Sequence, residues 1–348
     1  MNTSAPAAAT PGPIPVTVLT GYLGAGKTTL LNRILSEDHG RRYAVIVNEF
    51  GEIGIDNDLI VGADEEVFET ANGCICCTVR GDLIRVVSGL MKRRGKFDAI
   101  IVETTGLADP GPVAQTFFVD EEVRAKTKLD SVTTVVDARN LMARLADSRE
   151  AAEQIAFADQ IVLNKIDLVS ADELAAVERA VRRINPLAPI HPATRSAVPL
   201  DAVLARGGFD LGRILELEPQ FLDDAHDHAG GRDHDHAGHH HGHAHDHKHD
   251  PEIAGVSLEL DRPLDGRKAT DWLNRLLAER GPDILRAKGI LDVAGEDRRL
   301  VFQAVHMILE GELQRPWRND EPRRSRMVFI GRKLDAAELR AGFEACIA

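Results

Sequence analysis

The sequence predicts an α/β protein in which a doubly wound, mostly parallel sheet is followed by a smaller α+β domain. In the first part of the chain, short apolar runs alternate with amphipathic helical segments, as in a parallel sheet covered by helices. A glycine-rich turn joins the first apolar run, residues 16–19, to the first helix. A histidine-rich segment later interrupts the chain before globular patterning resumes, and such a change in composition marks a domain boundary.

The turn after the first predicted strand carries a phosphate-binding motif. Gly21, Gly26, Lys27 and Thr28 fill the template G-x-x-x-x-G-K-[ST] between a strand and a helix. Glycines in such a turn let successive N–H groups point at one place, and the helix N-terminus adds partial positive charge. The lysine can reach the β- and γ-phosphates, and the threonine hydroxyl can ligate Mg²⁺. We therefore expect a nucleoside triphosphate to bind here.

Carboxylates follow two further predicted strands. The second strand leads into NEFGE, which contains Glu49 and Glu52, and the strand 99–102 leads into ETTG, which runs from Glu103 to Gly106. Functional groups in α/β sheets gather at the carboxyl ends of strands. We expect the strand-end glutamate in the Mg²⁺ shell through a bound water, and the glycine amide at the γ-phosphate. For Glu49 and Glu52, two interpretations are equally supported: they approach the metal or sense the γ-phosphate, or they are solvated loop carboxylates.

A later strand ends in a guanine-reading motif. The apolar run 160–163 is followed by Asn164, Lys165, Ile166 and Asp167. The aspartate can accept hydrogen bonds from N1–H and the 2-amino group of guanine, a pattern that adenine does not offer. Leaving such a buried carboxylate unpaired costs a few kcal/mol, which discriminates strongly against ATP. The motif therefore disfavours an ATPase or a small-molecule kinase.

Three of the four cysteines lie in one short segment. Cys74, Cys76 and Cys77 belong to NGCICC, directly before a predicted helix start near Thr78. A helix N-terminus favours thiolate, and thiolates select soft or borderline ions such as Zn²⁺ or Cu(I). With a carboxylate or a water, three thiolates complete a tetrahedral zinc site. Because neighbouring side chains point in different directions, it stays open which thiols share one ion, and redox chemistry and packing are the alternatives.

The segment 226–249 contains eleven histidines, four aspartates, four glycines and no large apolar residue. It cannot form a core, and neutral imidazoles at this density capture Zn²⁺, Ni²⁺, Cu²⁺ or Co²⁺. We expect a disordered linker that binds metal, with a merely solubilising linker as the alternative. The histidines are His226, His228, His234, His236, His239, His240, His241, His243, His245, His247 and His249.

We predict four parts of the chain: a disordered lead-in over 1–14, a P-loop domain over 15–222, the histidine-rich linker over 223–251 and an α+β domain over 252–348. In the last part the pattern predicts helices over 265–279 and 335–346, and strands over 255–260, 284–293, 299–307 and 326–330. The basic stretch 315–332 is interpreted as a solvated face, and His306 as an isolated structural histidine.

Composition narrows the function classes. With 348 residues, 43% of them hydrophobic, the chain suits two globular domains. Its net charge of −13 argues against a general nucleic-acid binder. No apolar run reaches the roughly 18 residues of a membrane span, and the N-terminus lacks the pattern of a secretory signal. Few, clustered cysteines fit a reducing cytoplasm, so we expect a cytoplasmic protein that binds neither nucleic acid nor membranes.

Taken in order, TGYLGAGKTTLLN, NEFGEIGID, NGCICCT, ETTG and NKID resemble the CobW family of P-loop GTPases. PDILRAKGIL and RRSRMVFIGRKLD are similar to the family's smaller second domain. The resemblance covers nearly the whole chain, from about Pro13 onward. It implies a GTP-hydrolysing metallochaperone that delivers zinc or cobalt to a client metalloprotein, with GTP or GDP, Mg²⁺ and Zn²⁺ or Co²⁺ as its ligands.

The resemblance also implies residue roles. Lys27, Glu103 and Gly106 would serve GTP hydrolysis, and Cys74, Cys76 and Cys77 would form the metal-transfer site, while Thr28 would hold Mg²⁺. The nucleotide would be bound by Gly21, Gly24, Ala25, Gly26, Lys27, Thr28, Thr29, Asn164, Lys165 and Asp167. Val47 stands where some relatives have a further glutamate, which argues against an accessory metal site there.

These expectations favour a switch in which GTP supports a metal-holding state with the client engaged, and hydrolysis loosens the thiolate site. Turnover by the protein alone should be slow, because no arginine finger is recognisable in the sequence. The alternative function is a metal buffer that stores ions in the histidine-rich linker, with incidental GTP hydrolysis. The sequence leaves open the physiological metal, the client and a nucleotide- or metal-dependent homodimer.

Overall fold

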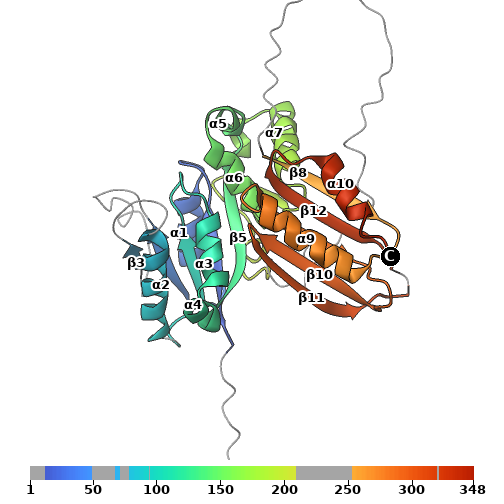
Figure 1. Cartoon of the computed structure of the whole chain (residues 1–348). Helices are drawn as coiled ribbons and strands as arrows, with labels where there is room; N and C mark the ends of the chain where they lie inside the picture. The colour runs from blue at the N-terminus through green and yellow to red at the C-terminus, as the bar shows by residue number, and fades with distance from the viewer. Residues whose placement is uncertain (1–11, 49–66, 71–77, 94, 209–252, 320) are drawn as a thin grey trace, which may run out of the picture.

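The computed structural model describes residues 12–48, 67–70, 78–93, 95–208, 253–319 and 321–348. They form two sheets with their own helices, one in each half of the chain (Figure 1). Several predicted site residues lie outside the described residues: Glu49, Glu52, Cys74, Cys76, Cys77 and the eleven histidines of 226–249. The predicted domain boundaries at 222/223 and 251/252 also lie outside them.

The first sheet has the strand order β3-β2-β4-β1-β5-β6-β7, and every neighbouring pair is parallel. The order runs in opposite directions on the two sides of β1, so the carboxyl end of β1 is the switch point at which such sheets bind ligands. This confirms the predicted doubly wound sheet. The strands are β1 (Ile14–Thr20), β2 (Tyr43–Asn48), β3 (Val67–Thr70), β4 (Ala99–Glu103), β5 (Thr127–Asp137), β6 (Gln160–Asn164) and β7 (Ile190–Pro192).

Helices cover both faces of this sheet. On one face α1 buries Leu30, Leu31 and Ile34, and on the other face α2, α3, α6 and α7 pack apolar side chains against the strands. The helices are α1 (Lys27–Ser36), α2 (Thr78–Met91), α3 (Gly111–Val119), α4 (Glu121–Lys126), α5 (Leu141–Asp147), α6 (Arg149–Phe157) and α7 (Ala171–Ile184), with the 3-10 turns η2 (Ile166–Leu168) and η3 (Leu200–Ala202). Among the helices in the described ranges, none has the length and apolar character that a membrane crossing requires.

The second sheet is antiparallel, with the order β11-β10-β9-β12-β8. Two helices, α9 and α10, pack on one of its faces around Phe302, Phe329 and Phe343, and this confirms the predicted α+β architecture. The elements are β8 (Ile253–Leu260), α9 (Gly266–Arg280), β9 (Ile284–Leu291), β10 (Arg298–Val305), β11 (Ile308–Pro316), β12 (Ser325–Arg332) and α10 (Ala336–Glu344).

The two domains share a core. The face of the second sheet away from α9 and α10 contributes Ile290, Val301 and Val328 to the same apolar cluster as α3, α6 and α7. Helices α6 and α7 lie against strands β8 and β9 (Figure 1). The second domain is therefore packed directly on helices of the nucleotide-binding domain.

Two sequence interpretations of the second domain need correction. The predicted strand 299–307 ends at Val305, because His306 adopts a left-handed φ of 51° and starts a turn into β11, which the sequence did not reveal. The basic stretch 315–332 is a solvated face only in part, because Arg318 and Arg323 are exposed and other arginines are not. Arg326 is only 8% exposed, and Arg315 pairs with Glu321 at 2.8 Å.

Candidate nucleotide-binding site

The P-loop follows β1 in a conformation that only glycine adopts easily. Gly21, Gly24 and Gly26 have φ values of 142°, 71° and 113°, in the region that side chains disfavour. A Cβ on Gly21 would lie 2.2 Å from the carbonyl oxygen of Val135 in β5. The glycines of the motif are therefore needed both for the turn and for its close approach to the neighbouring strand.

Lys27 begins α1 and holds its ammonium inside this turn. It is 9% exposed, and its Nζ donates hydrogen bonds to the carbonyl oxygens of Gly21 at 2.8 Å and Tyr22 at 3.4 Å. Thr28 is half-buried and Thr29 exposed in the first helical turn. This turn thus combines a lysine charge, a helix N-terminus and hydroxyl groups, which suits a chain of phosphates.

Asn164 ties the P-loop to the loop after β7. Its Nδ2 donates to the carbonyl oxygen of Ala25 at 2.8 Å, and its Oδ1 accepts from the backbone N–H of Ser196 at 2.8 Å. A Cβ on Gly26 would lie 2.4 Å from this Nδ2. The side chain of Asn164, 2% exposed, therefore supports the nucleotide site by joining two loops.

Lys165 is positioned by an aspartate that the sequence did not single out. Its backbone has a left-handed φ of 63°, and its Nζ donates to Asp137 at the end of β5 at 2.7 Å. Burial raises the pKa of Asp137, but hydrogen bonds from Lys165 and Asn140 outweigh it and hold this pKa below its ordinary value. The carboxylate is thus kept charged and fixes the lysine. Asp167 lies in η2 and is exposed, so its carboxylate is accessible to a nucleobase.

The ETTG element leaves β4 beside the P-loop. Glu103, 7% exposed, has Leu19 of β1 and Val47 of β2 as register neighbours. Two residues later, Thr105 carries a buried hydroxyl for which the described residues provide no hydrogen-bond partner. A Cβ on Gly106 would lie 2.6 Å from the backbone nitrogen of Leu23. Gly106 thus packs directly on the P-loop.

The residues at this edge fit a magnesium ion. Thr28, Glu103 and Thr105 all carry oxygen atoms, the ligand type that Mg²⁺ prefers. The Thr105 hydroxyl, which has no hydrogen-bond partner among the described residues, can contact a bound ligand or its water. The sequence motif contains both threonines, and the structure separates them by their hydroxyl partners. Thr104 Oγ1 donates to Thr20 Oγ1 at 2.8 Å, whereas Thr105 Oγ1 has no partner in the part of the chain that the structure describes. In the described ranges no three His, Cys, Asp or Glu side chains form a group suited to a metal.

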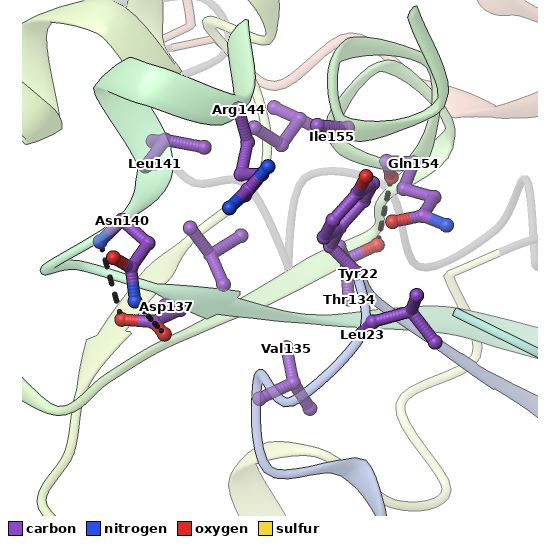
Figure 2. Close-up of a pocket in the computed structure, with 12 residues that line it drawn as sticks. Tyr22, Leu23, Thr134, Val135, Asp137, Asn140, Leu141, Arg144, Gln154 and Ile155 are labelled. Atoms are coloured by element: carbon purple, nitrogen blue, oxygen red, sulfur yellow. Dashed lines mark hydrogen bonds between the residues drawn. The ribbon is translucent and has the colours of Figure 1, made fainter. Parts of the chain in front are cut away.

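A cavity of about 310 Å³ opens beside the P-loop (Figure 2). Tyr22 and Leu23 line it on one side, and Asn140 and Arg144 of the α5 region on the other. The Arg144 guanidinium lies 5.5 Å from the centre of the Tyr22 ring, close enough for a cation–π contact. No motif in the sequence indicated that α5 would bring a positive charge next to the P-loop.

Comparison with known proteins identifies the family. A family model described as "CobW/HypB/UreG, nucleotide-binding domain" matches residues 15–192, and one described as "Cobalamin synthesis protein cobW C-terminal domain" matches residues 253–347. The chain belongs to the CobW family. The predicted resemblance and fold class are both confirmed.

Relatives in the CobW family are similar over nearly their full length. "Zinc chaperone YjiA" of Escherichia coli (strain K12) is 37% identical over 336 residues, which cover 95% of this chain and 98% of that protein. "Zinc chaperone CobW" of Sinorhizobium sp is 34% identical over 370 residues, with 98% and 99% covered. The crystal structure of Zn(II)-bound YjiA GTPase from E. coli matches with a TM-score of 0.73 and 32% identity, covering 97% of this chain and 100% of that one.

Proposed function

We propose that this protein is a cytoplasmic, GTP-hydrolysing metallochaperone that delivers zinc to a client metalloprotein. The names of its full-length relatives support the zinc and GTPase parts of this proposal. The P-loop and the end of the strand that precedes the cysteine segment share one edge of one sheet. Strands β3, β2, β4 and β1 are neighbours and parallel, so their carboxyl ends share that edge.

This shared edge is the observation that carries the proposal. The P-loop follows β1, Glu103 ends β4, and Thr70 ends β3 only four residues before Cys74 in the sequence. The register pairs Thr70 with Asn48 of β2, and Val47 with Glu103. The chain therefore enters the cysteine segment from the edge at which the phosphates are expected, and this supports a coupling between the γ-phosphate and the proposed thiolate site.

In the proposed reaction, water attacks the γ-phosphate of GTP to give GDP and phosphate. Lys27 binds the β- and γ-phosphate oxygens and Gly106 contacts the γ-phosphate, while Glu103 and Thr28 would hold Mg²⁺, which supplies neutralising charge when bound. Asp167 reads guanine, while Asn164 joins that loop to the P-loop and Lys165 is held by Asp137 of β5. Cys74, Cys76 and Cys77 are the proposed zinc ligands, and loss of the γ-phosphate releases the restraint on them.

A double substitution of Cys76 and Cys77 to serine tests the metal site. We expect zinc affinity, measured by competition with a tight chelator so that weak histidine sites stay empty, to fall by at least about 100-fold because thiolate ligands are lost. Affinity for a fluorescent GTP analogue should change less than about twofold, because the guanine and phosphate contacts stay in place.

The matched control is Cys346→Ser. This thiol is buried in the second domain, where its Sγ donates to the carbonyl oxygen of Gly342 at 3.2 Å, a bond that a hydroxyl also makes. The control should bind zinc as tightly as the unaltered protein. If the double variant kept that affinity too, the assignment of the transfer site would be wrong.

A further inference from the structure

We propose that the second domain senses the γ-phosphate state, because it sets the position of residues 106–111 through Gln154 of α6 and through His306. The proposal rests on the proposed function in one respect, the binding of guanine nucleotides at the P-loop. It assigns to the second domain a role in nucleotide discrimination, with Gln154, Arg332 and His306 as positioning residues.

Gln154 fixes the loop that contains Gly106. Its Nε2 donates to the carbonyl oxygens of Gly106 and Ala108, both at 3.1 Å, and the residue is 1% exposed. The backbone carbonyl oxygen of Gln154 accepts a hydrogen bond from Thr134 Oγ1 of β5 at 2.8 Å, an interaction drawn in Figure 2. Since Gly106 also packs on Leu23 of the P-loop, a shift of α6 must move this loop relative to the phosphates.

The second domain holds α6 at two places, in the middle of the helix and at its C-terminal end. Glu153, 5% exposed, is paired with Arg332 of β12 and also with Arg149 at 2.8 Å. At the C-terminal end of the helix, Arg286 of β9 donates to the carbonyl oxygen of Phe157 at 2.7 Å. Gln154, which contacts the loop, directly follows Glu153, which binds the second domain. Both contacts therefore depend on the same turn of α6.

A second contact reaches the loop directly. Asp109 accepts the N–H of Gly111 at 2.8 Å and thereby caps the start of α3. A Cβ on Gly111 would lie 2.8 Å from His306 Nε2 and 3.0 Å from Asp109 Oδ1, so the imidazole sits against this cap. Its ring also packs on Phe157, with the ring centres 5.3 Å apart. His306 is thus a structural histidine, as its sequence context predicted, and its place is at the contact between the two domains.

The pKa directions fit this tight enclosure. Burial raises the pKa of Asp109, and burial lowers the pKa of His306 although Asp109 opposes that shift.

Both ends of residues 106–111 are fixed by groups that the second domain supplies or holds, Gln154 at one end and His306 at the other. A ligand that moves this loop changes the interface, and by linkage a changed interface alters the relative affinity for that ligand.

The experiment compares the affinities of GDP and of a non-hydrolysable GTP analogue for the full chain and for Arg332→Gln, His306→Asn and Gln154→Leu. We expect the ratio of the two affinities to change by about fivefold to tenfold in each variant, with GDP affinity held within about twofold. Arg332→Lys, which keeps the charge facing Glu153, should restore most of the original ratio. If these residues only stabilised the fold, the substitutions would lower the affinities for GDP and for the GTP analogue by the same factor, or would change neither.

The matched control is Arg298→Gln, because Arg298 is exposed and pairs with Glu296 of its own domain at 3.1 Å. It should leave the ratio unchanged. An unaltered ratio in Arg332→Gln and Gln154→Leu overturns the inference, even if GTP is hydrolysed normally. If the full chain does not hydrolyse GTP but the ratio shifts as described, the inference stands and the proposed hydrolysis fails.

Discussion

Asp167→Asn is expected to lower the affinity for GTP by at least about 100-fold and to create a preference for xanthosine triphosphate. The carboxylate is proposed to accept two hydrogen bonds from guanine, and each such bond to a charged group contributes about 1.5–3 kcal/mol. The asparagine amide presents a donor to the 2-amino group of guanine. Xanthine carries an oxygen at that position, which can accept from the amide. Displacement of a fluorescent GTP analogue by each nucleotide measures both effects.

Asp172→Asn provides the control for this change. Asp172 lies in the exposed first turn of α7, five residues after Asp167, and faces solvent. The same loss of charge there should leave the affinity for GTP within about twofold of the original value. Unchanged GTP binding in Asp167→Asn, or no gain for the xanthine nucleotide, would contradict the assignment of the guanine-reading residue.

Asp159→Asn is expected to lower the free energy of unfolding by about 3–5 kcal/mol, the usual result of breaking a buried ion pair. Asp159 follows α6 and is 3% exposed. It pairs with Arg286 and with Lys288 of β9, the latter at 3.3 Å, and accepts the backbone N–H of Val132 at 2.9 Å. Removal of its charge leaves two buried cations at the domain interface without this carboxylate. Equilibrium denaturation followed by circular dichroism measures the loss.

The control is Asp147→Asn, whose side chain is 54% exposed and pairs with Arg144 at 2.8 Å. Exposed pairs of this kind contribute at most about 1 kcal/mol. If both variants lost equally little stability, the buried pair at Asp159 would not hold the two domains together in the way the contacts indicate.

Local patterns predicted the parts of the fold that depend on local chemistry. The P-loop was recognisable because strand, glycines, lysine and helix are contiguous, and its geometry explains each glycine. The turn at His306 was missed because the apolar pattern runs on from Val305 to Ile308, with only two residues of turn between them. Burial of Arg326 could not be predicted either, because its environment is formed by strands β8 and β9, which are distant in sequence.

The same limit applies to the site. Asn164 was expected to bind the base, and in the structure its amide joins the P-loop to Ser196. Gln154 and Asp137 belong to no motif, because their roles arise only when α6 and β5 are packed beside the P-loop. The assignments of Cys74, Cys76 and Cys77 remain predictions from sequence, since these residues lie outside the described part of the chain.

The most direct measurement is the zinc affinity of the full chain with no nucleotide, with GDP and with a non-hydrolysable GTP analogue, each determined against a tight chelator. If the thiolate site shares its framework with the γ-phosphate, zinc should bind at least about tenfold more tightly with the GTP analogue than with GDP. Equal zinc affinity in all three states would show that the metal and the nucleotide bind independently, and would contradict delivery driven by GTP.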